Sequence, residues 1–211
     1  MKIIINFLIG LVSLFGFYAT MAQQASASKI EGTPYLNEQY VEGEIFFGET
    51  NRASHAKVPV RYNIYQDLME YQQNGKALVL DPTKKIKKVK VGDETFVVEQ
   101  FNMDGKSKFG FLNVLDTGKM TLMSKKMIKY TEPLQGKALD GGDLPAKFSR
   151  LSDTYFYRFG DGELKEVGNL KELIASLPDK QDEVKQFAKQ EKISPKKEDE
   201  LLKLVRYYNS L

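Results

Sequence analysis

The chain of 211 residues contains no cysteine and only one histidine, His55. Without cysteine it can form no disulfide, offer no thiolate to a metal and carry no lipid on a cysteine at a signal-peptide cleavage point. A single histidine excludes metal sites with several imidazole ligands, and a Ser-His-Asp triad could use only His55. This residue lies in the polar stretch GETNRASHAK, which holds no nucleophile-elbow motif, so we expect it in an exposed loop.

Other motifs of common enzymes are also missing. Gly105-Lys106-Ser107 looks like the end of a phosphate-binding loop, but that loop needs a glycine where the chain has Gln100. Carboxylates are numerous, yet no spacing singles out an acid/base pair or a calcium loop. The sequence therefore predicts no catalytic residue, no metal site and no cofactor. A hydrolase that uses carboxylates alone is the enzymatic alternative, and it requires two inward-facing acids in one cleft.

The chain has no strong excess of charge of one sign. Its formal net charge is +3, and loss of Lys2 with a signal peptide brings the remainder closer to neutral. A near-neutral protein has no global field that gathers polyanions, so we expect no nucleic-acid partner. The composition, 42% hydrophobic and 28% charged, is that of a folded globular protein.

The N-terminus, MKIIINFLIGLVSLFGFYATMAQQ, has the pattern of a signal peptide. Lys2 precedes an apolar run from Ile3 to about Tyr18, and small residues up to Ala22 place the cleavage before Gln23. A retained membrane anchor is the alternative, but the run is short for a span, which needs about 20 residues. The sequence thus predicts an exported protein, periplasmic or at the cell surface, without a transmembrane span after cleavage.

Composition divides the rest of the chain into four segments. Past the signal peptide (1–22) they are a flexible polar leader (23–39), a β body (40–130), a loop or linker rich in proline and glycine (131–150), and a hairpin followed by helices (151–211). The chain is long enough for one domain, or for one domain with an appendage.

Short β-prone runs recur through the β body, at 41–47, 58–65, 68–72, 77–80, 86–91, 95–101, 108–115 and 120–130. Turn dipeptides separate several of them: Asn74-Gly75, Gly92-Asp93, Asp104-Gly105 and Thr117-Gly118. Asn-Gly and Asp-Gly supply the positive φ angles that tight hairpins need, so neighbouring runs should pair antiparallel. We predict an α+β fold in which an antiparallel meander curves into a barrel-like sheet or packs as a sandwich.

The last segment changes from a strand period to a helical one. A hairpin is predicted around Gly160-Asp161-Gly162, and a first helix then begins after Asn169 and stops at Pro178. Asp179 is expected to open a second helix, and Ser194-Pro195 a third, with the stripe Leu201, Leu204, Val205 and Tyr208. Helices this short are marginal alone in water, so we expect their apolar stripes to dock on the β body.

A lysine-rich run, DPTKKIKKVKVGD, is the most prominent charged feature. Its members are Lys84, Lys85, Lys87, Lys88 and Lys90. In KVKV polar and apolar residues alternate, so Val89 and Val91 should face a core while the lysines face water. The favoured interpretation is a solvated strand face, and the alternative is a surface patch that contacts acidic lipid or polysaccharide.

Aromatic residues are frequent in the predicted strands and just before the helices. A hydrophobic core with exposed tyrosine hydroxyls explains them. The functional alternative is an aromatic-lined cavity in a curved sheet, which would hold an apolar or sugar ligand.

Two stretches carry a resemblance: VPVRYNIYQDLMEYQQNGKALVLDP and the ending PDKQDEVKQFAKQEKISPKKEDELLKLVRYYNSL. They are similar to an uncharacterised family of exported proteins from Bacteroidota-type bacteria. The resemblance implies an envelope location and a strand-rich body with a helical end, and it brings no reaction and no functional residues. The expected role is non-enzymatic, the binding of an envelope protein or surface component. A carrier or sensor of a small apolar ligand is the first alternative.

Overall fold

A computed structural model describes residues 30–49, 52–82, 86–139 and 141–211 of the chain. The predicted signal peptide, the first part of the leader (23–29), and Lys84 and Lys85 lie outside these residues. The strands are β1 (Val41–Glu49), β2 (Arg52–Asn63), β3 (Leu68–Gln73), β4 (Lys76–Val79), β5 (Ile86–Val91), β6 (Glu94–Met103), β7 (Lys106–Asp116), β8 (Met120–Lys125), β9 (Ile128–Thr131), β10 (Lys147–Arg150), β11 (Thr154–Phe159) and β12 (Lys165–Glu166). The helices are α1 (Leu170–Ala175), α2 (Gln181–Gln190) and α3 (Glu198–Ser210).

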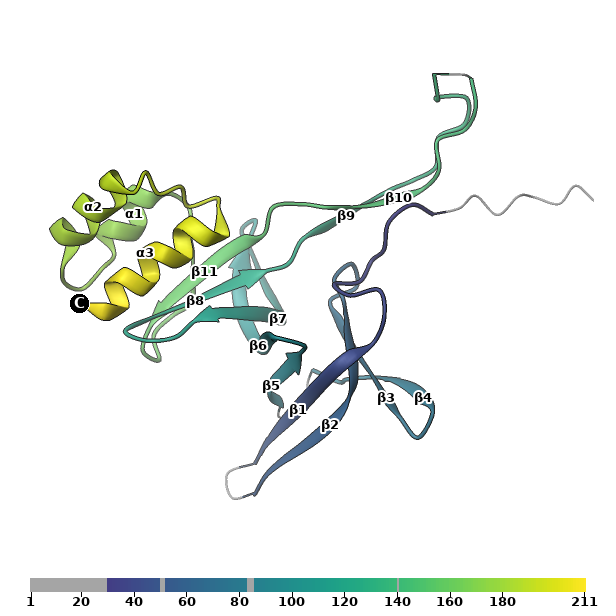
Figure 1. Ribbon diagram of the computed structural model, residues 1–211, viewed down its shortest axis with the longest axis horizontal. Coiled ribbons are helices and arrows are strands. Elements are labelled where there is room, and N and C mark those ends of the chain that lie inside the picture. Colours follow the sequence, from purple (N-terminus) through teal and green to yellow (C-terminus); the bar gives the residue numbers. More distant parts are fainter. Residues whose placement is uncertain (1–29, 50–51, 83–85, 140) are drawn as a thin grey trace, which may run out of the picture.

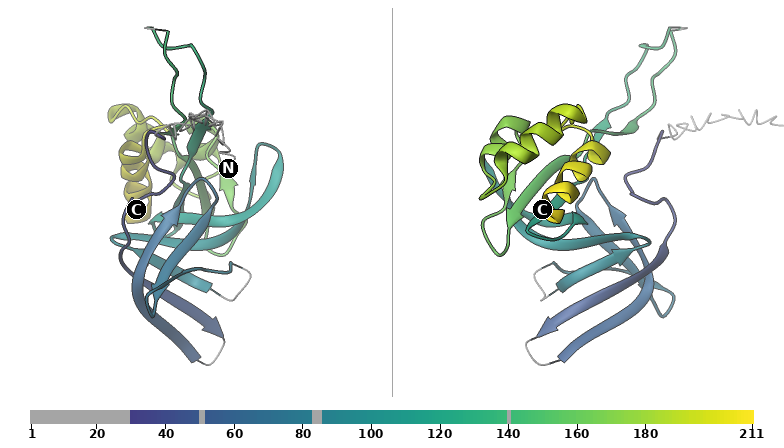
Figure 2. Two further views of the ribbon diagram at one scale, coloured as in Figure 1. Left: turned by 90° about the vertical axis from the view of Figure 1, so that its right-hand side faces the viewer. Right: turned by 60° about the vertical axis from the view of Figure 1, so that its left-hand side comes forward.

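The fold is α+β with an antiparallel meander, which confirms the predicted class. Ten strands form one sheet in the order β12-β11-β8-β7-β6-β5-β1-β2-β3-β4, and β9 pairs with β10 separately. Neighbours in the sheet are neighbours along the chain except at two places, where β5 lies beside β1 and β11 lies beside β8. The sheet curls on itself without closing (Figure 2).

Hairpin turns lie where the turn dipeptides predict them. Asn74 and Gly75 join β3 to β4 with φ angles of 52° and 72°, and Asp104 and Gly105 join β6 to β7 with 54° and 70°. Two consecutive positive φ angles define a type I′ turn, whose twist matches that of the paired strands. The prediction of tight hairpins at these dipeptides is therefore confirmed.

Buried side chains form three clusters along the curled sheet. One fills the curl between β1, β2, β3, β5, β6 and β7 and includes Ile45, Val60, Tyr62, Met69, Val89, Phe96 and Phe111. A second lies between the helices and one face of β8 and β11. The third covers the other face of these two strands and includes Phe101, Met103, Leu112, Met123 and Phe156. Strands β8 and β11 are thus covered on both faces.

The helices dock on the sheet, as their apolar stripes predict (Figure 1). Leu201, Leu204 and Tyr208 of α3 are buried against β8 and β11. The Asn209 amide pairs with the backbone of Met120, donating to its carbonyl at 3.0 Å and accepting from its N–H at 2.8 Å. This contact requires a glycine at position 118, because a Cβ there would lie 2.7 Å from the Asn209 side chain.

Helix starts agree with the sequence only in part. Asn169 caps α1 as predicted, because its side-chain oxygen accepts the N–H of Glu172 at 2.9 Å. The prediction that Ser194-Pro195 opens the third helix is wrong. These residues form a preceding turn, and α3 begins at Glu198.

The leader from residue 30 onward follows the sheet. Leu36 donates its backbone N–H to the carbonyl of Tyr62 at 2.9 Å, and Ile64 donates to Pro34 at 2.8 Å. Arg61 reinforces this path, because its guanidinium lies 3.8 Å above the Tyr35 ring and forms a 2.8 Å ion pair with Glu70. The expectation of a flexible leader is therefore wrong for residues 30–39, since hydrogen bonds and stacking hold them along β2.

The predicted strand at 120–130 is two strands, and the predicted loop at 131–150 contains a third. β8 stays in the main sheet, whereas β9 leaves it and pairs with β10. The described residues between 132 and 146 continue this pair as a narrow ribbon, here called the arm, which projects away from the body (Figure 1). Leu134 and Leu144 exchange two backbone hydrogen bonds of 3.0 and 2.8 Å within the arm. The arm is a hydrogen-bonded extension that the sequence predicts only as a linker.

Candidate functional site

The described lysines of the lysine-rich run lie on β5 in the middle of the sheet. Val89 and Val91 are buried, Lys87 and Lys90 are exposed, and Lys88 is half-buried, which confirms the predicted alternation. Lys87 falls at a register shift, since Phe46 opposes Lys88 while the next residue of β1 opposes Ile86. The extra residue turns Lys87 out of the alternation.

The outer face of β1, β2 and β5 gathers charged residues around one aromatic ring. The ammonium groups of Lys88 and Lys90 lie 4.7 and 5.7 Å from the Phe46 ring centre. His55 stacks on the same ring, with centroids 5.8 Å apart, and its Nε2 is 3.5 Å from Glu44. His55 is exposed as predicted, but it belongs to β2 and not to a loop. Because two lysine ammonium groups lie over the Phe46 ring, this face is a cation–π surface.

A second cluster of charged side chains lies at the end of β8, where the pairing between β8 and β7 stops. The Lys125 ammonium donates to Asp67 Oδ1 at 2.6 Å, to the Tyr62 hydroxyl at 3.2 Å and to the carbonyl of Phe111 at 3.2 Å. Tyr62 in turn donates its hydroxyl proton to Asp67 at 2.5 Å, and the Phe111 N–H points at the same carboxylate oxygen at 3.4 Å. Asp67 and Lys125 therefore hydrogen-bond the N–H and the carbonyl of Phe111, a residue of β7 that lies outside the stretch paired with β8.

The local backbone is shaped to bring Asp67 to this position. Asp67 has a φ of 55°, a left-handed conformation that aspartate tolerates better than most residues. A Cβ on Gly110 would lie 1.9 Å from the Asp67 carboxylate, so only glycine allows the approach. Burial lowers the pKa of Lys125, while the neighbouring Asp67 acts in the opposite direction. All three protons of the ammonium have acceptors, which makes the group a lock between strands and not a free nucleophile.

The next residue, Lys126, points to the opposite face of the sheet, toward the start of α3. Burial opposes its charge, but Asp153, Glu94 and Glu198 raise its pKa above the ordinary value. Its ammonium lies 3.1 Å from Asp153 and 3.5 Å from Glu94. Lys125 and Lys126 thus point to opposite faces of the sheet at the end of β8. The sequence signal was SKKM within an otherwise apolar strand, where alternation places one lysine on each face.

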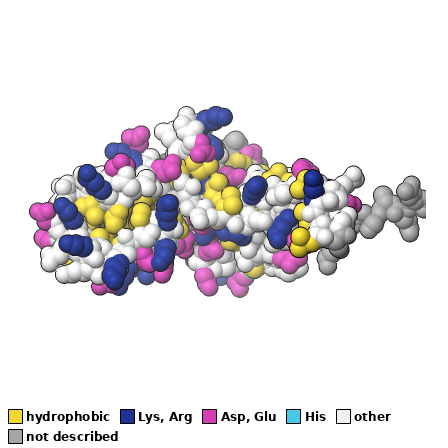
Figure 3. Space-filling view, turned by 90° about the horizontal axis from the view of Figure 1, so that it is seen from above, with side chains coloured by type: hydrophobic (Ala, Val, Ile, Leu, Met, Phe, Trp, Pro, Cys, Tyr) yellow, Lys and Arg dark blue, Asp and Glu magenta, His cyan; other side chains and the backbone are white. Residues whose placement is uncertain are grey.

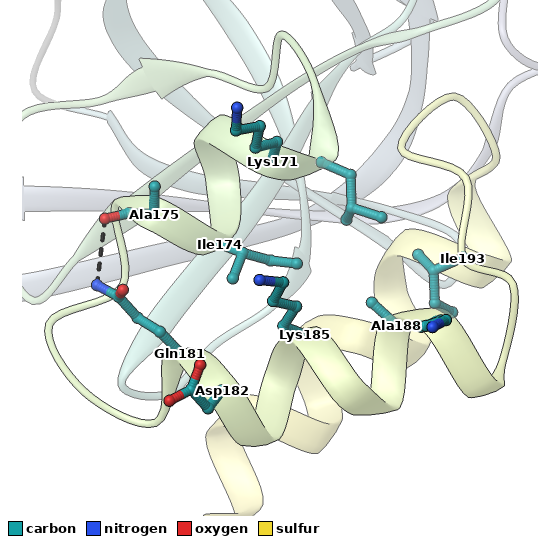
Figure 4. Close-up of a pocket in the computed structure, with 10 residues that line it drawn as sticks. Lys171, Ile174, Ala175, Gln181, Asp182, Lys185, Ala188 and Ile193 are labelled. Atoms are coloured by element: carbon teal, nitrogen blue, oxygen red, sulfur yellow. Dashed lines mark hydrogen bonds between the residues drawn. The ribbon is translucent and has the colours of Figure 1, made fainter.

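A surface groove of about 600 Å³ lies between α1 and α2. Its floor is apolar and its rim is charged; the lining residues are Leu170, Lys171, Ile174, Ala175, Gln181, Asp182, Lys185, Ala188, Lys189 and Ile193. Gln181 closes one end by donating to the carbonyls of Ala175 at 3.2 Å and Leu177 at 2.8 Å (Figure 4). The name "α1–α2 groove" refers to this depression below.

The α1–α2 groove carries a positive rim. Lys171, Lys185 and Lys189 border it, with Asp182 as the one acidic residue of its lining. These three lysines make no ion pair within the described part of the chain, whereas Lys203 of α3 pairs with Glu191. Figure 3 shows hydrophobic side chains gathered on the helical lobe with lysine and arginine side chains around them. In Figure 4 the ammonium of Lys185 points across the groove toward Ile174.

The sequence carried a partial signal for this groove. Lys185 and Lys189 are four residues apart, a spacing that places them on one face of a helix. The apolar stripe of α1 predicts a core-facing helix, and α1 does bury Leu173 and Ile174. What the sequence did not reveal is that the edge of this stripe borders an open groove, because that depends on how α2 packs beside α1.

Comparison with known proteins gives no assignment: no family model, no curated protein and no solved structure matches the chain. Among the described residues, no group of histidine, aspartate and glutamate side chains could hold a metal ion. No helix in the described ranges is long and apolar enough to cross a membrane.

Proposed function

We propose that the chain is exported and acts as a non-enzymatic binding protein of the cell envelope. In this proposal the α1–α2 groove takes a segment of a partner protein that presents an apolar side chain between carboxylates. The observation that carries it is the groove itself, an apolar floor with three lysines that have no carboxylate partner in the described chain.

The charge of the rim argues for an acidic partner segment. Long lysine side chains cover apolar surface with their methylene stems while their ammonium groups stay hydrated. A partner that inserts an apolar side chain displaces water from Ile174 and Ala188, and carboxylates beside that side chain meet the rim. Such charge complementarity raises the association rate and selects between partners more than it adds affinity.

Fluorescence anisotropy with two labelled peptides of equal length tests this function. One peptide has a leucine between glutamates and the other a leucine between lysines. We expect the acidic peptide to bind and to release as salt is raised, and the basic peptide not to bind. Lys185→Glu/Lys189→Glu should weaken binding at least tenfold.

Lys165→Glu/Lys196→Glu is the matched control, because it changes the net charge equally at two exposed lysines outside the groove lining. It should bind the acidic peptide like the wild type. Equal binding of the two peptides, or equal loss in both double variants, would contradict a groove that selects acidic segments.

Export is the second part of the proposal and rests on the pattern from Lys2 to Ala22. N-terminal sequencing of the protein from fractionated cells should give a chain that begins at Gln23. A cytoplasmic protein that still begins at Met1 would contradict export.

One observation favours a second candidate, the carriage of a small apolar ligand. An open pocket of about 440 Å³ lies beside Lys125 and is lined largely by apolar residues, among them Phe101, Met103, Phe109, Met127 and Ile128. Phe109 is 57% exposed there, an unusual position for a phenylalanine. Titration with a fluorescent fatty acid tests this candidate. Saturable binding that Phe109→Ser weakens at least fivefold would favour it over the groove.

A further inference from the structure

The arm presents leucines to solvent far from the body. Leu139 near its end is fully exposed, and Leu134 and Leu144 are 47% and 41% exposed. The last two form a hydrogen-bonded bridge, so their side chains lie on the same face of the ribbon. An apolar face of this kind has no core to cover and marks an interaction surface.

The arm has a defined structure at its end. Ala138 donates its N–H to Gly142 at 3.0 Å, Gly141 donates to Ala138 at 2.9 Å, and Gly136 donates to the Asp143 carboxylate at 2.9 Å. These bonds tie the described residues on the two sides of the arm end to each other, which reduces the ordering entropy that binding would otherwise require.

Prolines restrict how the arm can make contact. Pro133 and Pro145 flank the bridge between Leu134 and Leu144. Next to a hydrogen-bonded pair, backbone groups point outward, so a proline there breaks no hydrogen bond of the ribbon. It also removes the outward N–H that a further strand would use. The arm is thus suited to contact a partner through side chains and not by strand addition.

We propose that the end of the arm seats in the α1–α2 groove of a second copy of this chain, with Leu139 on the apolar floor. This inference rests on the proposed function, because it names the partner of the same groove. The described arm carries Glu132 and Asp143 against one lysine, Lys137, so its charge complements the lysine rim. The arm therefore combines an exposed apolar side chain with an excess of carboxylates, the two properties that the proposed function requires of a partner segment.

The geometry makes this contact intermolecular. Figure 1 shows the arm pointing away from the helical lobe, so the end of one arm does not lie at its own groove. Each copy has one arm and one groove, so two copies can exchange arms in a closed twofold dimer, or the contact can continue from copy to copy into rings and open chains. An arm end buries less surface than the roughly 1,200 Å² of a stable interface, so the association should depend on concentration.

Sedimentation velocity of the purified exported chain over a range of concentrations tests the proposal. The wild type should form dimers or larger assemblies as concentration rises. Leu139→Ser removes the apolar group of the arm, Lys185→Glu/Lys189→Glu reverses the rim, and each variant alone should remain monomeric. An equimolar mixture of the two should form dimers and nothing larger, because only one intact arm and one intact groove can meet.

Val79→Ser is the control, because it trims another exposed apolar residue, 55% exposed on the edge strand β4, and should assemble like the wild type. If Val79→Ser abolishes assembly and Leu139→Ser does not, edge pairing is the interface and the proposal is overturned. A wild type that stays monomeric while it still binds the acidic peptide overturns self-assembly and leaves the proposed function standing. Assembly restored in the mixture without binding of any acidic peptide supports the arm as a specific partner and removes the broader function.

Discussion

Replacement of Lys125 by methionine should destabilise the protein more than its peripheral position in β8 suggests. The ammonium has three acceptors, at 2.6 Å on Asp67 and 3.2 Å on Tyr62 and Phe111. Methionine keeps the apolar stem but leaves the Asp67 carboxylate facing the carbonyl of Phe111 without a cation between them.

The size of the effect follows from the burial of the two partners. Removing one member of a fully buried ion pair typically costs about 3–5 kcal/mol. The Asp67 side chain is 27% exposed, against 9% for Lys125, so water can partly replace the lost cation. We therefore expect Lys125→Met to lower the free energy of unfolding by about 2–3 kcal/mol.

A second substitution should recover much of this loss. Asparagine at position 67 tolerates the positive φ, removes the uncompensated charge and still accepts from Tyr62. We expect Lys125→Met/Asp67→Asn to be about 1 kcal/mol less stable than the wild type, which corresponds to a coupling of at least about 1 kcal/mol between the two sites.

Urea unfolding followed by circular dichroism measures these free energies, with tyrosine fluorescence as a second probe because the chain has no tryptophan. Lys108→Gln is the control, since Lys108 lines the same surface pocket as Lys125 and Asp67 and its side chain is 38% exposed. This substitution should change stability by less than about 0.5 kcal/mol. The stabilising role of the Lys125–Asp67 ion pair is refuted if Lys125→Met and Lys108→Gln lower the free energy of unfolding equally. It is also refuted if the losses of unfolding free energy from the substitutions at Lys125 and Asp67 simply add.

Three further predictions concern the helices, alkaline pH and the lysine-rich run. Leu204 is 1% exposed between helix and sheet, so Leu204→Ala should lower the unfolding free energy by about 2–5 kcal/mol in one transition; release of an intact β body by proteolysis would contradict docking. Burial raises the pKa of Tyr155 and of Tyr208 to about 12. The folded state therefore holds their protons more tightly, and stability should be complete below pH 10 and fall as pH rises toward 12, while absorbance at 295 nm shows delayed phenolate formation. Lys87→Gln/Lys88→Gln should change stability by only tenths of a kcal/mol, and loss of binding to anionic vesicles in that variant would restore a lipid-contact role.

The local parts of the fold could be predicted from the sequence because short-range chemistry decides them. Asn74-Gly75 and Asp104-Gly105 define hairpins by backbone preference alone, and Asn169 caps α1 with its own side chain. The pairing of β1 with β5 leaves no such mark, since both strands alternate in the same way whichever neighbour they meet.

The candidate sites were harder to predict because they depend on long-range packing. Asp67 and Lys125 are far apart in the sequence and meet only because the sheet curls. His55 looked like a loop residue because its surroundings are polar, yet a polar outer face is normal for a strand with one face in water. The departure of β9 from the sheet was hidden for a similar reason, since its residues are as β-prone as those of β8.

The two joins between non-consecutive strands also bear on how the chain folds. Strands β1 to β4 and β5 to β8 can each form through local hairpins, whose loops are short and close quickly. The join between β1 and β5, and that between β8 and β11, must wait until the intervening segment is ordered, and longer loops close at a greater entropic cost. During synthesis from the N-terminus, Met120 and Leu122 stay uncovered until α3 has been made, because α3 completes their apolar surroundings. The nascent chain therefore carries an exposed hydrophobic face that only its last helix removes.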